Sequence, residues 1–261
     1  MTSATMTRPA RTNAEQQAVV FAGIPFRHLL RVEWGKATDT RAARWLLALV
    51  AASTVGTVLA PMLAPSSIDQ TYTSYLGYAA LGLTILLPVV AILTLTSEWS
   101  QRTVLTTFTQ EPRRTRVINA KVAVSLLLAV GGAMFGGLVT AAGLAVATAS
   151  GRELDANLNV GVVVGYLLFV LLNVLNGVAF GALLHNSSVA IVLYFALPTA
   201  FALLGFALKS VAEWIDVSTT FNWVLLGEWS GHTPQILVSA VVWVAIPLAV
   251  GVVRTIRREI N

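Results

Sequence analysis

The chain has no cysteine, and only 11% of its 261 residues are charged. The absence of cysteine excludes disulfides, thiolate catalysis and cysteine-ligated metal sites. Soluble domains carry about 25% charged residues, so this low charge, beside 56% hydrophobic residues, indicates a membrane protein. The net charge of +5 would favour nucleic acid only if the basic residues gathered on a soluble surface. They lie between and beside apolar runs instead, and the sequence predicts no nucleic-acid partner.

Motifs for nucleotide and metal chemistry are also missing. The chain contains no GxxxxGKS or GxxxxGKT loop for nucleotide phosphates and no HExxH motif for zinc. Its three histidines, His28, His185 and His232, are expected on both sides of a membrane, where they cannot share a metal ion. The sequence therefore predicts a chain that is not an enzyme and holds no cofactor of its own.

Six apolar runs are long enough to cross a bilayer, for which a helix needs about 20 apolar residues. They cover residues 44–63, 75–96, 122–149, 160–184, 188–208 and 236–253. No lysine, arginine, aspartate or glutamate lies in the middle of any run. The predicted fold is an all-α polytopic membrane protein, with six spans in one transmembrane domain over residues 21–261.

The basic residues predict how these spans are oriented, because lysine and arginine are enriched in cytosolic loops. If the N-terminus is cytosolic, all but two of the 17 lysines and arginines face the cytosol, the exceptions being Arg152 and Lys209. Both termini are therefore predicted to be cytosolic. Polar residues 1–20 are expected to form a disordered cytosolic tail, and the whole chain to be a multi-pass protein of the cell membrane.

The segment IPFRHLLRVEWGK, residues 24–36, is too short and too charged to span a membrane. As a helix it would have an apolar side, formed by Phe26, Leu29, Leu30 and Trp34. The other side would be mostly basic, with Arg27, His28, Arg31 and Lys36. This pattern indicates an interfacial helix, within about residues 24–40, on the inner leaflet, whose anionic lipids attract basic side chains. The helix either anchors the chain only or also contributes to a docking surface.

The segment SEWSQRTVLTTFTQEPRRTRVINAK, residues 97–121, is polar and basic, although it separates two very apolar runs. A helix is predicted over residues 98–109, presenting Trp99, Val104, Leu105 and Phe108 among polar positions. Pro112 ends it, because proline disfavours helix at the preceding residue and has no N–H. One interpretation is a basic loop that binds lipid headgroups. The other is a docking helix, since a short helix with exposed apolar residues suits a groove on a partner.

The segment KSVAEWIDVSTTFNWVLLGEWSGHTPQ, residues 209–235, is too aromatic for a soluble loop. We expect one or two short helices that dip into the outer leaflet, followed by a turn at residues 231–234. Irregular backbone at that depth requires protein or a water-filled cavity beside it. The segment therefore either caps a cavity between helices, as a re-entrant outer cap, or rests on lipid.

Small and polar residues inside the runs indicate closely packed helices. GxxxG pairs occur at Gly132 and Gly136, Gly161 and Gly165, and Gly177 and Gly181, a motif too common in membrane bundles to identify one interface. Prolines predict kinks in the second, fifth and sixth spans, at Pro88, Pro198 and Pro247. Asn173 and Asn176 share a helical face. They either line a polar path or hydrogen-bond neighbouring helices, and packing is the favoured interpretation.

A spaced set of residues after the second run resembles a known family. Glu98, Thr103, Pro112, Arg114 and Lys121 match the pattern of permease subunits of type-2 ATP-binding-cassette (ABC) transporters. In that pattern a glutamate precedes Gly-Thr, a proline–arginine motif follows, and a lysine opens the third span. The chain departs from it at Arg102, where the family usually has glycine. The six-span order and the basic amphipathic helix before the first span are also similar to this family.

The resemblance implies a dimeric pathway, made with a second copy or a related permease, through the first, second and fifth spans. It implies two copies of a separate ATPase subunit, which would hold ATP and magnesium. Export of hydrophobic or amphipathic cargo is implied, such as a drug, antibiotic, peptide or lipid-like compound. Residues 97–119 would include the coupling helix that seats in the ATPase, and residues 24–40 would be the elbow helix.

The site residues that the resemblance implies lie in these two segments. Those expected to couple to the ATPase are Glu98, Trp99, Arg102, Thr103, Phe108, Pro112, Arg113 and Arg114. Those expected in the elbow helix are Phe26, Arg27, Arg31 and Trp34. Two other classes of function stay open. A secondary transporter or channel is disfavoured by the lack of acidic residues inside the spans, and a scaffold would recruit proteins without moving cargo.

Overall fold

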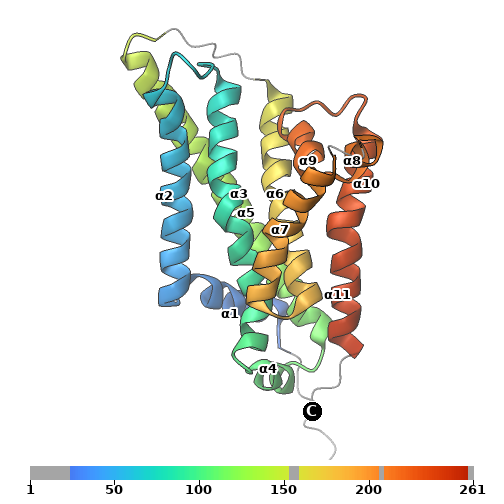
Figure 1. Cartoon of the computed structure of the whole chain (residues 1–261). Helices are drawn as coiled ribbons and strands as arrows, with labels where there is room; N and C mark the ends of the chain where they lie inside the picture. The colour runs from blue at the N-terminus through green and yellow to red at the C-terminus, as the bar shows by residue number, and fades with distance from the viewer. Residues whose placement is uncertain (1–23, 153–158, 206–208, 258–261) are drawn as a thin grey trace, which may run out of the picture.

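The computed structural model describes residues 24–152, 159–205 and 209–257, which form helices joined by turns (Figure 1). The first six helices are α1 (Phe26–Thr38), α2 (Arg41–Leu63), α3 (Tyr72–Ser100), α4 (Val104–Gln110), α5 (Arg114–Ala149) and α6 (Val160–Leu184). They are followed by α7 (Ser187–Gly205), α8 (Lys209–Ile215), α9 (Val217–Leu225), α10 (Thr233–Ala240), the π-helical turn η1 (Val241–Ala245) and α11 (Ile246–Arg257). The predicted tail over residues 1–20 lies outside the described residues.

Five stretches of helix are long and apolar enough to cross a membrane: α2, α3, α5, α6 and the continuous run Thr233–Arg257. They correspond to five of the six predicted spans. The fifth predicted span is α7, an apolar but shorter helix of 19 residues. Residues 206–208, where that span was predicted to end, lie outside the described residues. The chain is therefore a multi-pass membrane protein by the length and composition of its helices.

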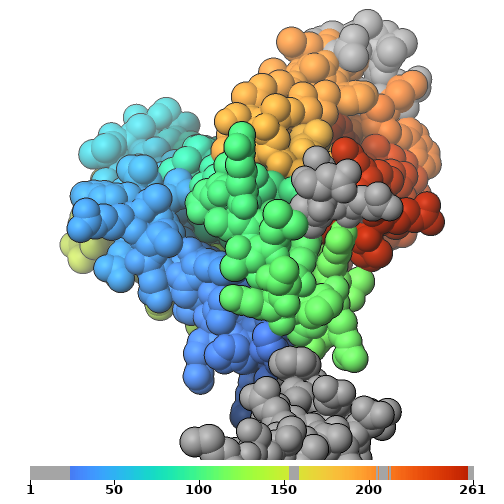
Figure 2. All heavy atoms as spheres, turned by 90° about the horizontal axis from the view of Figure 1, so that it is seen from below, coloured from blue at the N-terminus to red at the C-terminus, as the bar shows by residue number. Residues whose placement is uncertain are grey.

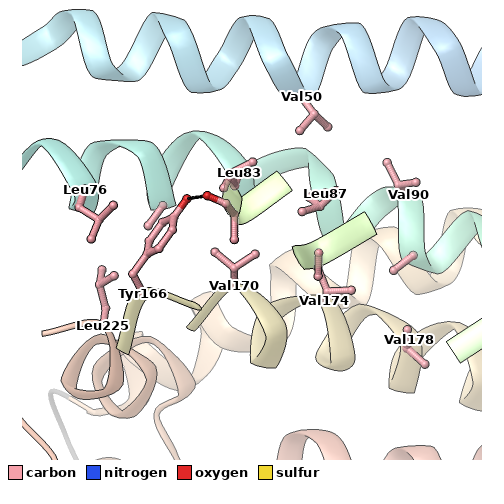
Figure 3. Packing of buried hydrophobic residues seen from close by; sticks show 14 of the residues in the cluster. Val50, Leu76, Leu83, Leu87, Val90, Tyr166, Val170, Val174, Val178 and Leu225 are labelled. Carbon is pink, nitrogen blue, oxygen red and sulfur yellow. Dashed lines mark hydrogen bonds between the residues drawn. The ribbon is translucent and has the colours of Figure 1, made fainter. Parts of the chain in front are cut away.

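Helix α3 lies at the centre of the bundle and packs against α2, α5 and α6. About 67% of the most apolar 18-residue stretch of α3 is buried within the chain, against 22% of the corresponding stretch of α2. Figure 3 shows the core around it, where Leu83 and Leu87 of α3 lie among Val50, Val170 and Val174 from α2 and α6. A helix that is apolar on all sides suits this central position, because every face contacts another helix.

Glycines allow the helix axes to approach α3 closely. A Cβ atom placed at Gly177 of α6 would lie 2.7 Å from the carbonyl oxygen of Pro88, and one at Gly82 would lie 2.5 Å from Cα of Thr54. On α5, a Cβ at Gly132 would lie 2.9 Å from a methyl group of Leu87. The GxxxG glycines of α5 and α6 therefore serve packing inside this chain.

The sixth predicted span contains a π-helical turn where proline disturbs the α-helical hydrogen bonds. Turn η1 has π-helical bonding and ends just before Pro247. Proline has no N–H for the preceding turn, and its ring crowds the carbonyl four residues earlier, at Trp243. A π-helical turn absorbs this mismatch without ending the helix. A π-helical turn thus lies just upstream of Pro247, where the sequence predicts a kink.

The two ends of the bundle differ in their elements (Figure 1). One end, which we call the α4 end, carries α1, α4, the start of α5 and the end of α11. Helices α8 and α9 lie at the opposite end. Arg152 and the start of α8 at Lys209 belong to that opposite end, away from the basic residues of α1, of the segments that flank α4, and of α11.

We expect Gly177→Ala to lower the free energy of unfolding by about 1–3 kcal/mol, because the added methyl group meets rigid backbone. Gly131→Ala is the matched control. Its Cβ would meet nothing within 4 Å, and it should be neutral or stabilising by up to about 1 kcal/mol. Thermal unfolding in mild detergent, followed by circular dichroism, measures both. Equal effects would contradict the close approach of α6 to α3.

Candidate functional site

Four charged side chains from three helices meet at the α4 end. Glu33 and Lys36 belong to α1, Glu98 to the end of α3 and Lys121 to α5. Lys36 Nζ lies 2.7 Å from Glu33 Oε1 and 2.6 Å from Glu98 Oε1. Lys121 Nζ lies 2.7 Å from Glu33 Oε2 and 3.3 Å from Glu98 Oε1. We call these four residues the charged junction.

Three members of the charged junction are almost completely removed from solvent. The exposed fraction of the side chain is 4% for Glu33, 9% for Glu98 and 6% for Lys121. Lys121 Nζ also donates to the backbone oxygen of Thr94 at 3.2 Å, and the Thr107 hydroxyl donates to Glu98 Oε1 at 3.1 Å. Buried charges need this degree of pairing, because an unpaired one would be strongly destabilising. The Thr107 bond brings α4 into the same network.

Lys36 is the accessible member, with 41% of its side chain exposed. Burial by itself lowers the pKa of Lys36, but hydrogen bonds and charge attraction from Glu33 and Glu98 outweigh burial, and the pKa lies above its ordinary value. Lys36 is therefore charged at neutral pH. While the two glutamates are ionised, its pairing stabilises the fold below the ordinary lysine pKa, and this contribution is lost as the pH rises through the higher folded-state value.

The predicted single helix over residues 98–109 is wrong. Helix α3 continues through Glu98 to Ser100, and α4 begins only at Val104. Between them Arg102 has φ of 59°, in the left-handed region. The Thr103 N–H donates to the backbone oxygen of Glu98 at 2.9 Å, and the Arg102 N–H donates to the backbone oxygen of Trp99 at 3.3 Å. These two hydrogen bonds form a Schellman motif that ends α3. The predicted break at Pro112 is present, because α4 ends at Gln110.

The apolar side chains of this segment differ in exposure, contrary to the prediction that all four are presented outward. Val104 is buried, and the Trp99 ring lies 4.4 Å from that of His185. The Arg114 guanidinium covers Phe108, 5.0 Å above the ring. Only Leu105 of the four is strongly exposed, at 52%. Because α4 has only seven residues, packing it onto the bundle buries or covers most of its apolar side chains.

A second set of contacts holds the connection between α4 and α5. Arg116 pairs with Glu111 at 2.6 Å and donates to the backbone oxygen of Ile24, before α1, at 2.6 Å. Arg114 donates to the backbone oxygen of Thr255 in α11 at 2.9 Å. Pro112 and Arg113, between these arginines and α4, are exposed. The loop around α4 is thus fixed to α1 on one side and α11 on the other.

The predicted elbow residues Phe26, Arg27, Arg31 and Trp34 are all exposed. The face of α1 that packs on the bundle is instead formed by Glu33 and Ala37, which are buried. Glu33 was not among the predicted elbow residues. The signal was present, because Glu33 is the only acidic residue between residues 24 and 36, and a single acid among cations in an interfacial helix suggests a specific partner.

Asn173 and Asn176 lie in α6, away from the charged junction. Asn173 Nδ2 donates to the Phe169 oxygen at 2.8 Å, and the Tyr194 hydroxyl of α7 donates to Asn173 Oδ1 at 3.4 Å. Asn173 thus connects two helices, as the packing interpretation predicts. Asn176 is 2% exposed, and its Oδ1 has no hydrogen-bond partner within the described ranges.

The segment over residues 209–235 contains two short helices, α8 and α9, where the sequence predicts one or two. Helix α9 packs against α6, where Gly165 lies directly beside the Val224 carbonyl group. The Trp243 indole donates to the Ile215 backbone oxygen at 2.7 Å. Placement as a re-entrant outer cap remains a prediction.

The described ranges contain no group of three histidine, aspartate or glutamate side chains that could hold a metal ion. Comparison with protein-family models finds no match, and neither does comparison with curated proteins.

Arg102→Gly should stabilise the protein by about 1 kcal/mol, because glycine adopts the left-handed conformation without the cost that Arg102 incurs. Arg102→Ala is the matched control, since alanine removes the side chain but keeps this cost. Thermal unfolding of the three proteins measures the difference. The same gain for alanine and glycine would assign the effect to the side chain.

Glu33→Gln should destabilise the protein by about 3–5 kcal/mol, because it leaves an excess buried positive charge. Arg31→Gln, at an exposed position of the same helix, should change stability by no more than about 0.5 kcal/mol. Adding Lys121→Met to Glu33→Gln restores charge balance and should recover much of the loss. Unfolding in detergent checks all three, and a loss no larger than that of Arg31→Gln would refute the role given to the junction.

Proposed function

We propose that this chain is the membrane-spanning subunit of an ATP-driven ABC exporter, with the α4 end in the cytosol. The observation that carries the proposal is the charged junction, which joins α1 and α4 to the ends of two long apolar helices. A force applied to α4 from outside the membrane would pass through the Thr107–Glu98 hydrogen bond into α3. The Glu98–Lys121 pair extends this connection into α5.

The resemblance to type-2 permeases gains support from where its motif residues lie. Glu98 and Lys121 stand at opposite ends of the motif and come within 3.3 Å of each other. Arg102 has the backbone conformation that glycine favours, and glycine is usual there in the family. These features give the motif a physical meaning, in which one ion pair closes the loop that contains α4.

In this proposal α4 is the coupling helix and α1 the elbow helix. The exposed side chains available to an ATPase subunit include Leu105 on α4 and Arg113 beside it. Glu98 through its side chain and Thr103 through its backbone N–H would fix the shape of the loop. ATP and magnesium would be held by two partner subunits, and a second permease chain would complete a pathway in the cell membrane for hydrophobic or amphipathic cargo.

An energy source on another chain fits the described spans. A carrier driven by an ion gradient usually places ionisable side chains within its spans, whereas the charges of this chain concentrate at the α4 end. Nothing in the geometry favours a second candidate specifically, so a secondary transporter, a channel and a scaffold remain outcomes of the experiment.

The test is purification of the chain in mild detergent from its native membranes, with mass spectrometry of the proteins that accompany it. A stoichiometric ATPase is expected with the wild type, and at least about tenfold less with Leu105→Ala combined with Arg113→Ala, a loss of about 1.4 kcal/mol of binding. The matched control combines Leu63→Ala, exposed on α2 at the opposite end, with Arg257→Ala.

Three outcomes would contradict the proposal. The ATPase could be absent although the oligomer survives, or it could remain equally bound to the Leu105 and Arg113 variant. Cargo uptake driven by an ion gradient in liposomes that contain only this chain would identify a secondary transporter instead.

A further inference from the structure

A cavity of about 590 Å³ opens beside the charged junction at the α4 end. It is bounded by α1, the start of α2, the end of α3 and α4, and Figure 2 views this end of the molecule, with α1 in blue and α4 in green. Its volume lies within the range of about 300–1,000 Å³ that is usual for small-molecule sites. The proposed function does not use this cavity.

One part of the cavity wall is apolar. Leu29 and Val32 of α1 contribute to it, with Leu46 of α2 and Val90 and Leu93 of α3. The side chains from α2 and α3 belong to helices that lead into the apolar bundle. The wall suits a hydrocarbon group of limited length, because burying such a group is favourable in proportion to the apolar area removed from water.

Another part of the wall offers uncharged hydrogen-bonding groups. They come from Ser97, Gln101, Thr103, Thr106 and Gln110. None of these side chains makes a hydrogen bond in the part of the chain that the structure describes, whereas Thr107 beside them is used by Glu98. The three hydroxyl groups and two amides can therefore donate to and accept from a polar ligand.

The charged groups on the wall are already neutralised by partners. Glu33 and Glu98 each contact both lysines of the junction, and Glu111 pairs with Arg116. A charged ligand group would have to compete with bonds of 2.6–2.7 Å. An uncharged group loses less by leaving water and needs no free counter-charge.

We propose that this cavity binds an uncharged amphiphile, with its hydrocarbon part against Leu46, Val90 and Leu93 and its hydroxyl or amide groups against Gln101, Thr106 and Gln110. The ligand would lie between α1 and α4 and fill the space that separates them. Its chemistry is shared by a neutral membrane glycolipid and by a neutral amphipathic compound that reaches the site from solution.

The test uses the full chain, with the partners that accompany it, in phosphatidylcholine nanodiscs. The probe is an octyl glucoside with a photoreactive diazirine in its alkyl chain, and the comparison probe is the octyl sulfate with the same diazirine. Saturable labelling of peptides from α1, α3 and α4 is expected with the glucoside, at least about tenfold stronger than with the sulfate. That ratio corresponds to about 1.4 kcal/mol of binding preference.

Leu93→Trp, which fills the apolar part of the cavity, should reduce this labelling about tenfold, again about 1.4 kcal/mol. Leu81→Trp is the matched control, on the same helix at an exposed position outside the cavity. Thr106→Val combined with Gln110→Leu tests the polar part at the exposed surface of α4, where folding is not at risk. Circular dichroism verifies the fold of each variant.

Equal labelling by both probes, or equal labelling of the two tryptophan variants, would overturn the proposal. The source of the natural ligand is decided by lipid analysis of the chain purified from its own membranes. A neutral glycolipid that accompanies the wild type and is lost in Leu93→Trp identifies a resident lipid. Saturable glucoside labelling without any such lipid identifies a ligand that arrives from solution. Neither result depends on whether the chain binds an ATPase.

Discussion

The pairing of two buried acids with two lysines at one end of the bundle constrains the rest of the structure. Glu33, Glu98 and Lys121 are almost fully buried, and each would be expensive to leave unpaired at the edge of an apolar bundle. Satisfying all of them requires α1 to lie across the end of α3 and the part of α5 that holds Lys121. The orientation of α1 therefore follows from one electrostatic requirement, which hydrophobic packing alone would not impose.

This constraint acts on a bundle that is itself closely packed around α3. Glycines at positions such as Gly82 and Gly177 place neighbouring backbones against α3 at distances that no other residue allows. Displacement of the end of α3 is therefore passed to α2, α5 and α6 rather than absorbed by side chains, because closely packed interiors have few voids into which they can deform. The charged junction and the glycine contacts complement each other: one connects the outer segments to α3, and the other connects α3 to the remaining helices.

The sequence predicts five of its six spans well, because a long apolar segment in a bilayer must satisfy its own backbone hydrogen bonds, as a helix does. The bounds of α6 agree with the predicted run, and α2 and α3 extend theirs by a few residues. The pairing of charges within the junction could not be predicted, since Glu33 and Lys121 are 88 residues apart in the sequence and Lys36 and Glu98 are 62 apart. The helix predicted over residues 98–109 failed for a local reason: propensity cannot foresee a left-handed arginine held by two backbone hydrogen bonds. The prediction of an outward-facing apolar side was wrong for a tertiary reason, because Val104 and Trp99 pack onto the bundle.

The unequal burial within the junction indicates where the structure can move. The Glu33–Lys121 pair is shielded from water, so breaking it would expose two charges to an apolar surrounding at high cost. Lys36 is partly hydrated, and water can replace its bond to Glu98 at much smaller cost. A rotation of α1 about the Glu33–Lys121 pair would therefore break the Lys36–Glu98 contact first and leave the buried pair intact. That rotation changes the separation of α1 from α4, which is the space the cavity occupies, so an occupied cavity opposes closure of α1 toward α4 and an empty one permits it.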